Sequence, residues 1–115
     1  MLPRENQRAP GMGALLAIAW FAGSLFPGAA SAGTQHQVVI DAMQYSPQTL
    51  EVRRGDVVVW TNKDPFPHTA SSDGQGFDSK EIPADGTWTM EATREGTYPY
   101  HCTLHPTMHG VLVVK

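Results

Sequence analysis

The sequence contains a single cysteine, Cys102, among its 115 residues, so no internal disulfide can form. Basic residues are also scarce, because residues 33–115 carry six Lys and Arg against ten Asp and Glu. A mildly acidic chain of this kind lacks the clustered positive charge that nucleic-acid binding requires. These two shortages exclude a disulfide-stapled scaffold and argue against a nucleic-acid-binding domain.

Long apolar runs are equally scarce, with one exception near the start of the chain. Residues 12–26 carry no charge, follow two arginines and precede an Ala-x-Ala-like cleavage site. This order is typical of a secretory signal peptide, and the run is shorter than the about 20 residues that cross a bilayer. The sequence therefore predicts a signal peptide over 1–32, export to the periplasm, and a mature domain over 33–115 without a membrane span.

The predicted domain shows no apolar repeat of helical period long enough for a substantial helix. Short runs of β-branched and alternating apolar residues, separated by Gly, Pro, Asn and Asp, indicate strands and turns instead. Such a pattern predicts an all-β sandwich or barrel. The expected strands cover residues 37–43, 49–53, 57–62, 86–92, 97–102 and 110–114, with a turn or edge segment at 45–48 and a short strand near 77–79.

The densest group of potential metal ligands lies near the carboxyl end of the chain. Cys102, His105 and Met108 follow the spacing Cys-x-x-His-x-x-Met. Thiolate and thioether donors select copper, zinc or iron–sulfur chemistry, and two His with one Cys and a weak axial Met form blue-copper sites. Metal binding would also occupy a lone thiol that is otherwise a liability in an oxidising compartment. The motif lacks one histidine of the blue-copper set.

Four other histidines could supply the missing ligand. His101 is next to the cysteine on an expected strand, so its side chain should point to the opposite face. His36 lies near the expected mature terminus, where order is usually poor, and His109 is expected at the surface. His68 follows the most apolar expected strand and is the preferred fourth ligand. The sequence leaves open whether His36 or His109 adds a second, weaker metal site.

Three blocks of sequence carry a family resemblance: Tyr45-x-Pro47-x-x-Leu50-x-Val52, Gly55-Asp56-x-Val58-x-Trp60-x-Asn62-x-Asp64, and Tyr98-x-Tyr100-His101-Cys102-Thr103-x-His105-Pro106-x-Met108-x-Gly110. With these blocks the chain resembles the cupredoxins of the plastocyanin/azurin group, in particular the amicyanin and pseudoazurin branch. The resemblance implies a Greek-key β-sandwich. It also implies one type 1 copper ion, held by His68, Cys102, His105 and Met108.

The same resemblance implies a function. It indicates a monomeric one-electron carrier between larger redox proteins such as a dehydrogenase, a cytochrome or an oxidase, and not an enzyme. It implies a hydrogen bond from the backbone N–H of Thr69 to the sulfur of Cys102, and we hypothesise a second such bond from Leu104. The alternative is a protein for copper storage, delivery or resistance, which would use the same ligands with an exchangeable metal.

Overall fold

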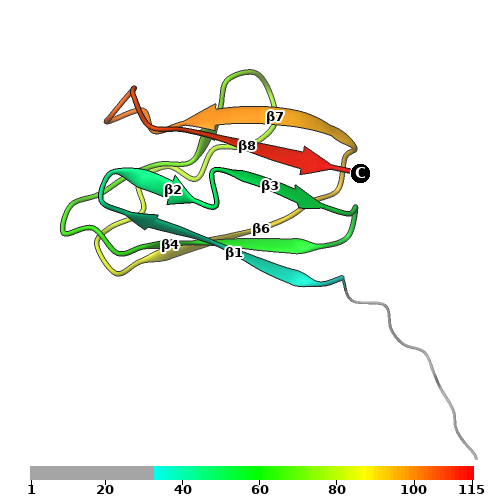
Figure 1. Ribbon diagram of the computed structural model, residues 1–115, viewed down its shortest axis with the longest axis horizontal. Helices are drawn as coiled ribbons and strands as arrows, with labels where there is room; N and C mark the ends of the chain where they lie inside the picture. The colour runs from blue at the N-terminus through cyan, green and yellow to red at the C-terminus, as the bar shows by residue number, and fades with distance from the viewer. Residues whose placement is uncertain (1–32) are drawn as a thin grey trace, which may run out of the picture. The chain divides into compact units, whose positions relative to one another are not determined.

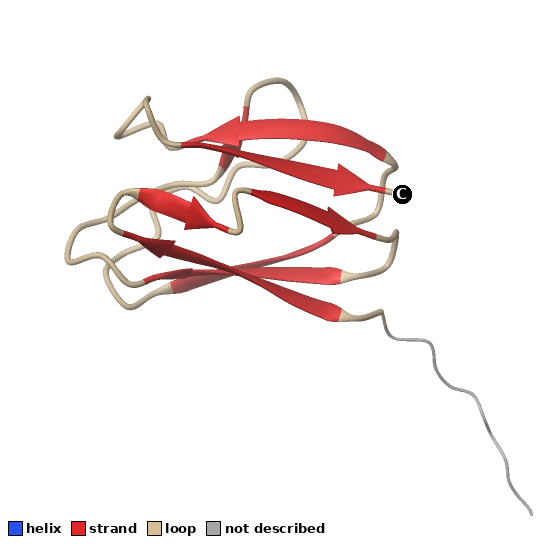
Figure 2. Cartoon of the chain, viewed as in Figure 1, coloured by secondary structure: helices blue, strands red, loops and turns tan. Residues whose placement is uncertain are grey.

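The computed structural model describes residues 33–115, which form two packed β-sheets (Figure 1). Figure 2 shows strands and loops, and no helix, in this part of the chain. It therefore holds no helix with the length and apolarity that a membrane crossing needs. The predicted signal peptide over 1–32 lies outside the described residues. The all-β sandwich that the sequence predicts is confirmed.

Eight strands make up the two sheets of the described residues. They are β1 Gln35–Asp41, β2 Gln44–Ser46, β3 Thr49–Val52, β4 Val57–Asn62, β5 Ser71–Ser72, β6 Thr87–Glu91, β7 Gly96–His101 and β8 His109–Val114. One sheet has the order β2-β1-β4-β6 and the other β3-β8-β7-β5. The β1/β4 and β3/β8 neighbours are parallel, and the remaining neighbours are antiparallel.

The expected turn or edge segment at 45–48 overlaps β2, which pairs with β1 at the edge of its sheet, in agreement with the expectation. The short strand expected near 77–79 is wrong. No strand forms at 77–79, where Asp78 contributes only an isolated bridge to Ser71. The strand in this region is β5, which pairs with β7 through Ser71 and His101. The serine-rich segment has no alternation of apolar residues from which a strand could be predicted. It is a strand only because it pairs with β7.

The core between the sheets is built on aromatic side chains. Trp60 from β4 is fully buried, and its Nε1–H donates to the hydroxyl of Tyr100 from β7 at 3.3 Å. The two rings meet edge to face, with centroids 5.7 Å apart. Burial raises the pKa of Tyr100 to about 12, although the hydrogen bond from Trp60 acts in the opposite direction. The phenol is therefore neutral at physiological pH and links the two sheets.

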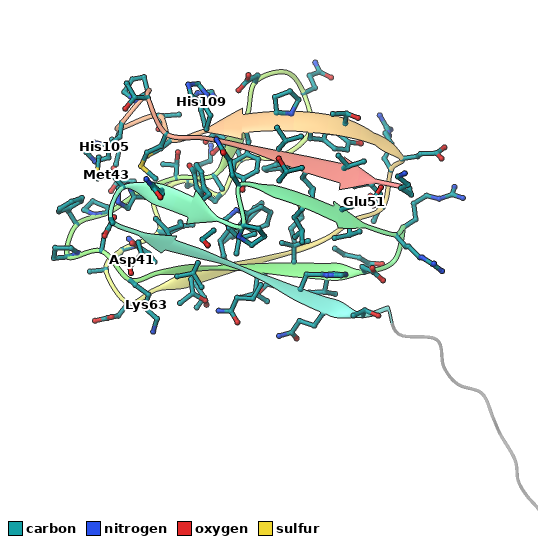
Figure 3. All side chains as sticks on the ribbon, viewed as in Figure 1. Asp41, Met43, Glu51, Lys63, His105 and His109 are labelled. Atoms are coloured by element: carbon teal, nitrogen blue, oxygen red, sulfur yellow. The ribbon has the colours of Figure 1, made fainter. Side chains whose placement is uncertain are left out.

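The connections that follow β1, β4 and β7 meet at one end of the sandwich (Figure 1). In Figure 3 this end carries Met43, Lys63 and His105, whereas Glu51 lies at the opposite end. The parallel pairing of β1 with β4 explains why their following connections lie together. The fold thus brings three separate segments to the end where the predicted ligands lie.

Candidate metal centre

The predicted ligands Cys102, His105 and Met108 share one compact loop between β7 and β8. The N–H of His105 donates to the carbonyl of Cys102 at 3.2 Å, and the N–H of Met108 donates to the carbonyl of His105 at 2.9 Å. The N–H of Cys102 donates in return to the carbonyl of Met108 at 3.3 Å. These bonds hold the backbone of all three residues close together. Cys102 and Met108 are buried, and His105 is half-buried.

His68 reaches this loop from the connection after β4. Its backbone pairs with Ile82, with N–H to carbonyl distances of 3.2 and 2.7 Å in the two directions. The imidazole is fully buried, and its Nδ1 lies 3.7 Å from the Sγ of Cys102. Two potential ligands that are 34 residues apart in the chain are therefore in contact.

Asp64 holds the other side of the His68 ring, with 2.7 Å between Oδ2 and Nε2. The carboxylate also accepts the N–H groups of Ala42 and Met43 at 2.8 and 3.0 Å. Burial raises the pKa of Asp64, but the hydrogen bonds from Met43, His68 and Ala42 outweigh this effect and lower it overall. Because an ionised carboxylate only accepts, Nε2 carries the hydrogen, and Nδ1 presents its lone pair towards the sulfur.

Asp64 is a functional residue that sequence reasoning missed. The sequence analysis used it only as part of a family motif. The signal that could have found it is a carboxylate four residues before a candidate ligand, directly after the most apolar strand. A buried carboxylate needs partners, and the ring of a nearby histidine is one of them.

The sulfur of Cys102 is fully buried and accepts a hydrogen bond from the backbone N–H of Thr69 at 3.3 Å. This is the bond that the family resemblance implies. The hypothesised second bond from Leu104 is wrong, because Thr69 is the only backbone donor to this sulfur among residues 33–115. The tight turn between Cys102 and His105 instead leaves Leu104 at the surface, 43% exposed.

Tyr45 supports the Thr69 backbone from the core. Its hydroxyl donates to the carbonyl of Thr69 and is buried. Burial raises the pKa of Tyr45, and the nearby charges of Cys102 and Tyr100 act in the same direction. The phenol thus remains a hydrogen-bond donor at physiological pH and holds the carbonyl of the same residue whose N–H donates to the sulfur.

His105 lies between His68 and the surface. Its ring centroid is 4.9 Å from that of His68 and 5.7 Å from that of Phe66. Phe66 is 39% exposed and, with Leu104, makes up the exposed large hydrophobic residues of the described chain. An imidazole beside two exposed apolar side chains is accessible to another protein.

The four predicted ligands do not form a closed cluster in the structure. Residues 33–115 contain no group of three or more His, Cys, Asp or Glu side chains already arranged to hold a metal ion. His68 and Cys102 are in contact, whereas His105 is near through its ring and Met108 through its loop. The donor chemistry fits copper, since a thiolate, two imidazoles and a thioether are its blue-copper set. The ligand assignment remains a prediction.

The other histidines have different surroundings. The Nδ1 of His101 lies 2.7 Å from the Oδ1 of Asp73, on the outer side of the sheet, as expected for the neighbour of a buried cysteine. His109 is exposed, as predicted. The expectation of poor order at His36 is wrong: it lies in β1, and its Nε2 is 2.9 Å from the Oδ2 of Asp56.

Comparisons with known proteins agree with this arrangement. The family model of the cupredoxin-like domain matches residues 13–114. Amicyanin from Paracoccus denitrificans is 33% identical over 96 residues, which cover 77% of this chain and 73% of that protein. Amicyanin-alpha from Methylorubrum extorquens is 30% identical over 84 residues, covering 69% and 71%.

Solved structures give the same result. The Cu(I) form of an amicyanin variant superposes with a TM-score of 0.66 at 30% identity, covering 76% of this chain and 86% of that one. A purple cupredoxin from Nitrosopumilus maritimus gives a TM-score of 0.64 at 31% identity, covering 69% and 98%. The resemblance inferred from the sequence blocks and the predicted fold class are both confirmed. The chain belongs to the cupredoxin-like domain family and is amicyanin-like within it.

Proposed function

We propose that this protein is a blue-copper electron carrier whose metal ligands are His68, Cys102, His105 and Met108. The cofactor of the family is one type 1 copper ion. The observation that carries the proposal is the contact between the buried sulfur of Cys102 and the Nδ1 of His68, 3.7 Å apart. The lone pair of this nitrogen is free because Asp64 holds the opposite ring nitrogen.

Copper, when bound, supplies reversible one-electron chemistry. The protein supplies a buried sulfur with one N–H donor, two imidazoles and the thioether of Met108. His68, Cys102, His105 and Met108 would hold the ion, and a donor set of two imidazoles, one thiolate and one weakly binding thioether would suit both oxidation states. Four side-chain donors leave no open position for a substrate, whereas catalytic metal sites usually keep one. The set therefore favours a carrier over a catalyst.

Electrons would enter and leave through His105. It is the half-buried member of the donor set, and its ring lies next to Phe66 at the surface. The exposed side chains of Phe66 and Leu104 would form the docking surface for a larger redox protein, such as a dehydrogenase, a cytochrome or an oxidase. A partner that buries this apolar surface comes close to the imidazole without forming ion pairs. Such a contact suits a short-lived complex.

The proposal includes export. Residues 1–32 would be removed as a signal peptide, and residues 33–115 would act as a monomer in the periplasm. The lone thiol in an oxidising compartment is then protected by burial and by the metal.

The test is the absorption and EPR spectrum of residues 33–115 after loading with Cu(II). We expect intense thiolate-to-copper charge transfer in the visible range, and its complete loss in Cys102→Ser. The matched control is His36→Gln, which removes a histidine that pairs with Asp56 and should keep the full absorption. A protein that stays colourless, or a Cys102→Ser variant that keeps the absorption, would refute the proposal.

Metal exchange separates the carrier from the alternative of copper storage or delivery. A carrier should cycle reversibly between Cu(II) and Cu(I) and retain copper against a chelator through many cycles. Rapid transfer of copper to the chelator in either oxidation state would instead support storage or delivery.

A further inference from the structure

Two histidines outside the proposed ligand set lie opposite each other on neighbouring strands. In the antiparallel register of β7 and β8, His101 is the partner of His109. The next pair along, Tyr100 and Gly110, is buried in the core. Because side chains alternate between the two faces of a sheet, the histidine pair projects from the outer face. His101 is accordingly half-exposed and His109 exposed.

The backbone hydrogen bonds place this pair at the closer of the two antiparallel spacings. The N–H of Cys102 donates to the carbonyl of Met108 at 3.3 Å. This bond joins the residues next to the two histidines, so the histidines form a non-hydrogen-bonded pair. In a non-hydrogen-bonded pair the Cα atoms typically lie about 4.5 Å apart. The side chains are then closer to each other than in a hydrogen-bonded pair. Two imidazoles in this relation can bind one ion between them.

A carboxylate orients one of the two rings. The Oδ1 of Asp73 lies 2.7 Å from the Nδ1 of His101. With Nδ1–H donating to this carboxylate, the Nε2 of His101 is the nitrogen that carries a free lone pair. A carboxylate that fixes the tautomer of a ligating histidine is a common feature of protein metal sites, and it also strengthens the imidazole as a donor.

We propose that His101 and His109 form a second Cu(II) site on the outer face of β7 and β8, with Asp73 as a positioning residue. Two imidazoles with water in the remaining positions suit the tetragonal preference of Cu(II), and copper outranks the other divalent metals for nitrogen donors. Asp73 binds the ring of His101, and residues 33–115 hold no group of three or more His, Cys, Asp and Glu side chains arranged for a metal ion. The ion should therefore exchange readily. This site goes beyond the proposed electron carriage and does not depend on it.

The test starts from residues 33–115 loaded with one equivalent of copper and adds a second equivalent of Cu(II). We expect EPR to show a second, non-blue signal with coupling to imidazole nitrogen, and equilibrium dialysis to give one further bound ion. The affinity of this ion should fall at least tenfold in His109→Gln and roughly tenfold in Asp73→Asn. Unchanged blue absorption in His109→Gln would show that the fold and the first site are intact.

Two further variants separate this proposal from other sources of binding. His36→Gln should leave the second ion in place, because His36 lies in the other sheet and pairs with Asp56. Cys102→Ser should also keep the second signal, so the result does not depend on the blue site. Equal affinity in His109→Gln and the unchanged protein, loss of the signal only in His36→Gln, or no second ion at all would each overturn the proposal.

Discussion

Asp64 is the residue that most directly connects the backbone to the chemistry of the centre. It fixes the tautomer and orientation of His68 through Nε2, and both of its oxygens accept hydrogen bonds. Its only salt-bridge partner among residues 33–115 is His68. Its negative charge would therefore act on an ion bound by the Nδ1 of His68. A partner of this kind tunes the metal as well as placing the ligand.

Replacing Asp64 by Asn should raise the reduction potential of the copper centre. The carboxylate stabilises Cu(II) more than Cu(I), because Cu(II) carries the larger positive charge. A buried carboxylate and an ion on opposite sides of one imidazole interact by about 1–3 kcal/mol at the effective dielectric constant of about 20 that suits protein sites. For a one-electron couple this corresponds to a shift of roughly 40–130 mV. Protein-film voltammetry of the two loaded proteins measures it.

Asp41→Asn is the matched control for this measurement. Asp41 is an exposed carboxylate at the same end of the molecule (Figure 3), so solvent and salt screen its charge. Its removal should shift the potential much less than removal of Asp64. An unchanged or lower potential in Asp64→Asn would contradict the role that we assign to its charge.

At the scale of elements, the turn between β1 and β2 depends on the same carboxylate. Ala42 and Met43 form its two central positions, with φ values of +53° and +63°. Such left-handed conformations are unfavourable for residues other than glycine. The hydrogen bonds from both N–H groups to Asp64 offset this cost. One side chain thus couples a strained hairpin turn to His68, a proposed metal ligand on a different connection.

The β7–β8 pair carries a steric constraint at Gly110. A Cβ at this position would lie 2.4 Å from the Cζ of Tyr100, whose ring is held by the hydrogen bond from Trp60. Gly110→Ala should therefore lower the free energy of unfolding by about 1–3 kcal/mol through overpacking. Urea denaturation of the metal-free protein measures this loss. Gly74→Ala is the control, since an added Cβ there meets nothing within 4 Å. Equal midpoints for the two variants would contradict the constraint.

At the scale of the whole molecule, acidic groups set the lower pH limit of stability. The backbone N–H of Arg53, followed by the His36 ring, lowers the pKa of Asp56. The backbone N–H of Lys80 likewise lowers the pKa of Asp78, and the pKa of Asp64 is lowered as well. These carboxylates therefore lose their proton more readily in the folded protein than in the unfolded chain.

The sign of this linkage predicts acid destabilisation. A carboxylate whose pKa is depressed on folding contributes stability above its unfolded pKa, and the contribution is lost as the pH falls through the folded value. The unfolding free energy of the metal-free protein should thus change little for these groups between pH 7 and about pH 5 and fall below about pH 4. Denaturation followed by tryptophan fluorescence measures it. Asp56→Asn should weaken the pH dependence, and greater stability at low pH would contradict the prediction.

The sequence alone determined the features that depend on local pattern. Apolar alternation and β-branched runs placed most strands close to their observed bounds, because a half-buried strand imposes that pattern along its own length. The spacing of Cys102, His105 and Met108 predicted one ligand loop, since three donors within seven residues need no distant contact to lie together. The acidic balance and the single cysteine were equally readable without a structure.

Only the tertiary structure decided how distant segments meet. It set His68 against Cys102, placed Asp64 behind His68, and paired His36 with Asp56. It also made a strand of Ser71–Ser72 by pairing it with β7. These contacts join residues from different connections, and the packing of two sheets with their crossover pairings fixes which connections lie together. The sequence pattern along one segment does not specify that packing, so the partners of the proposed ligands became visible only in the folded molecule.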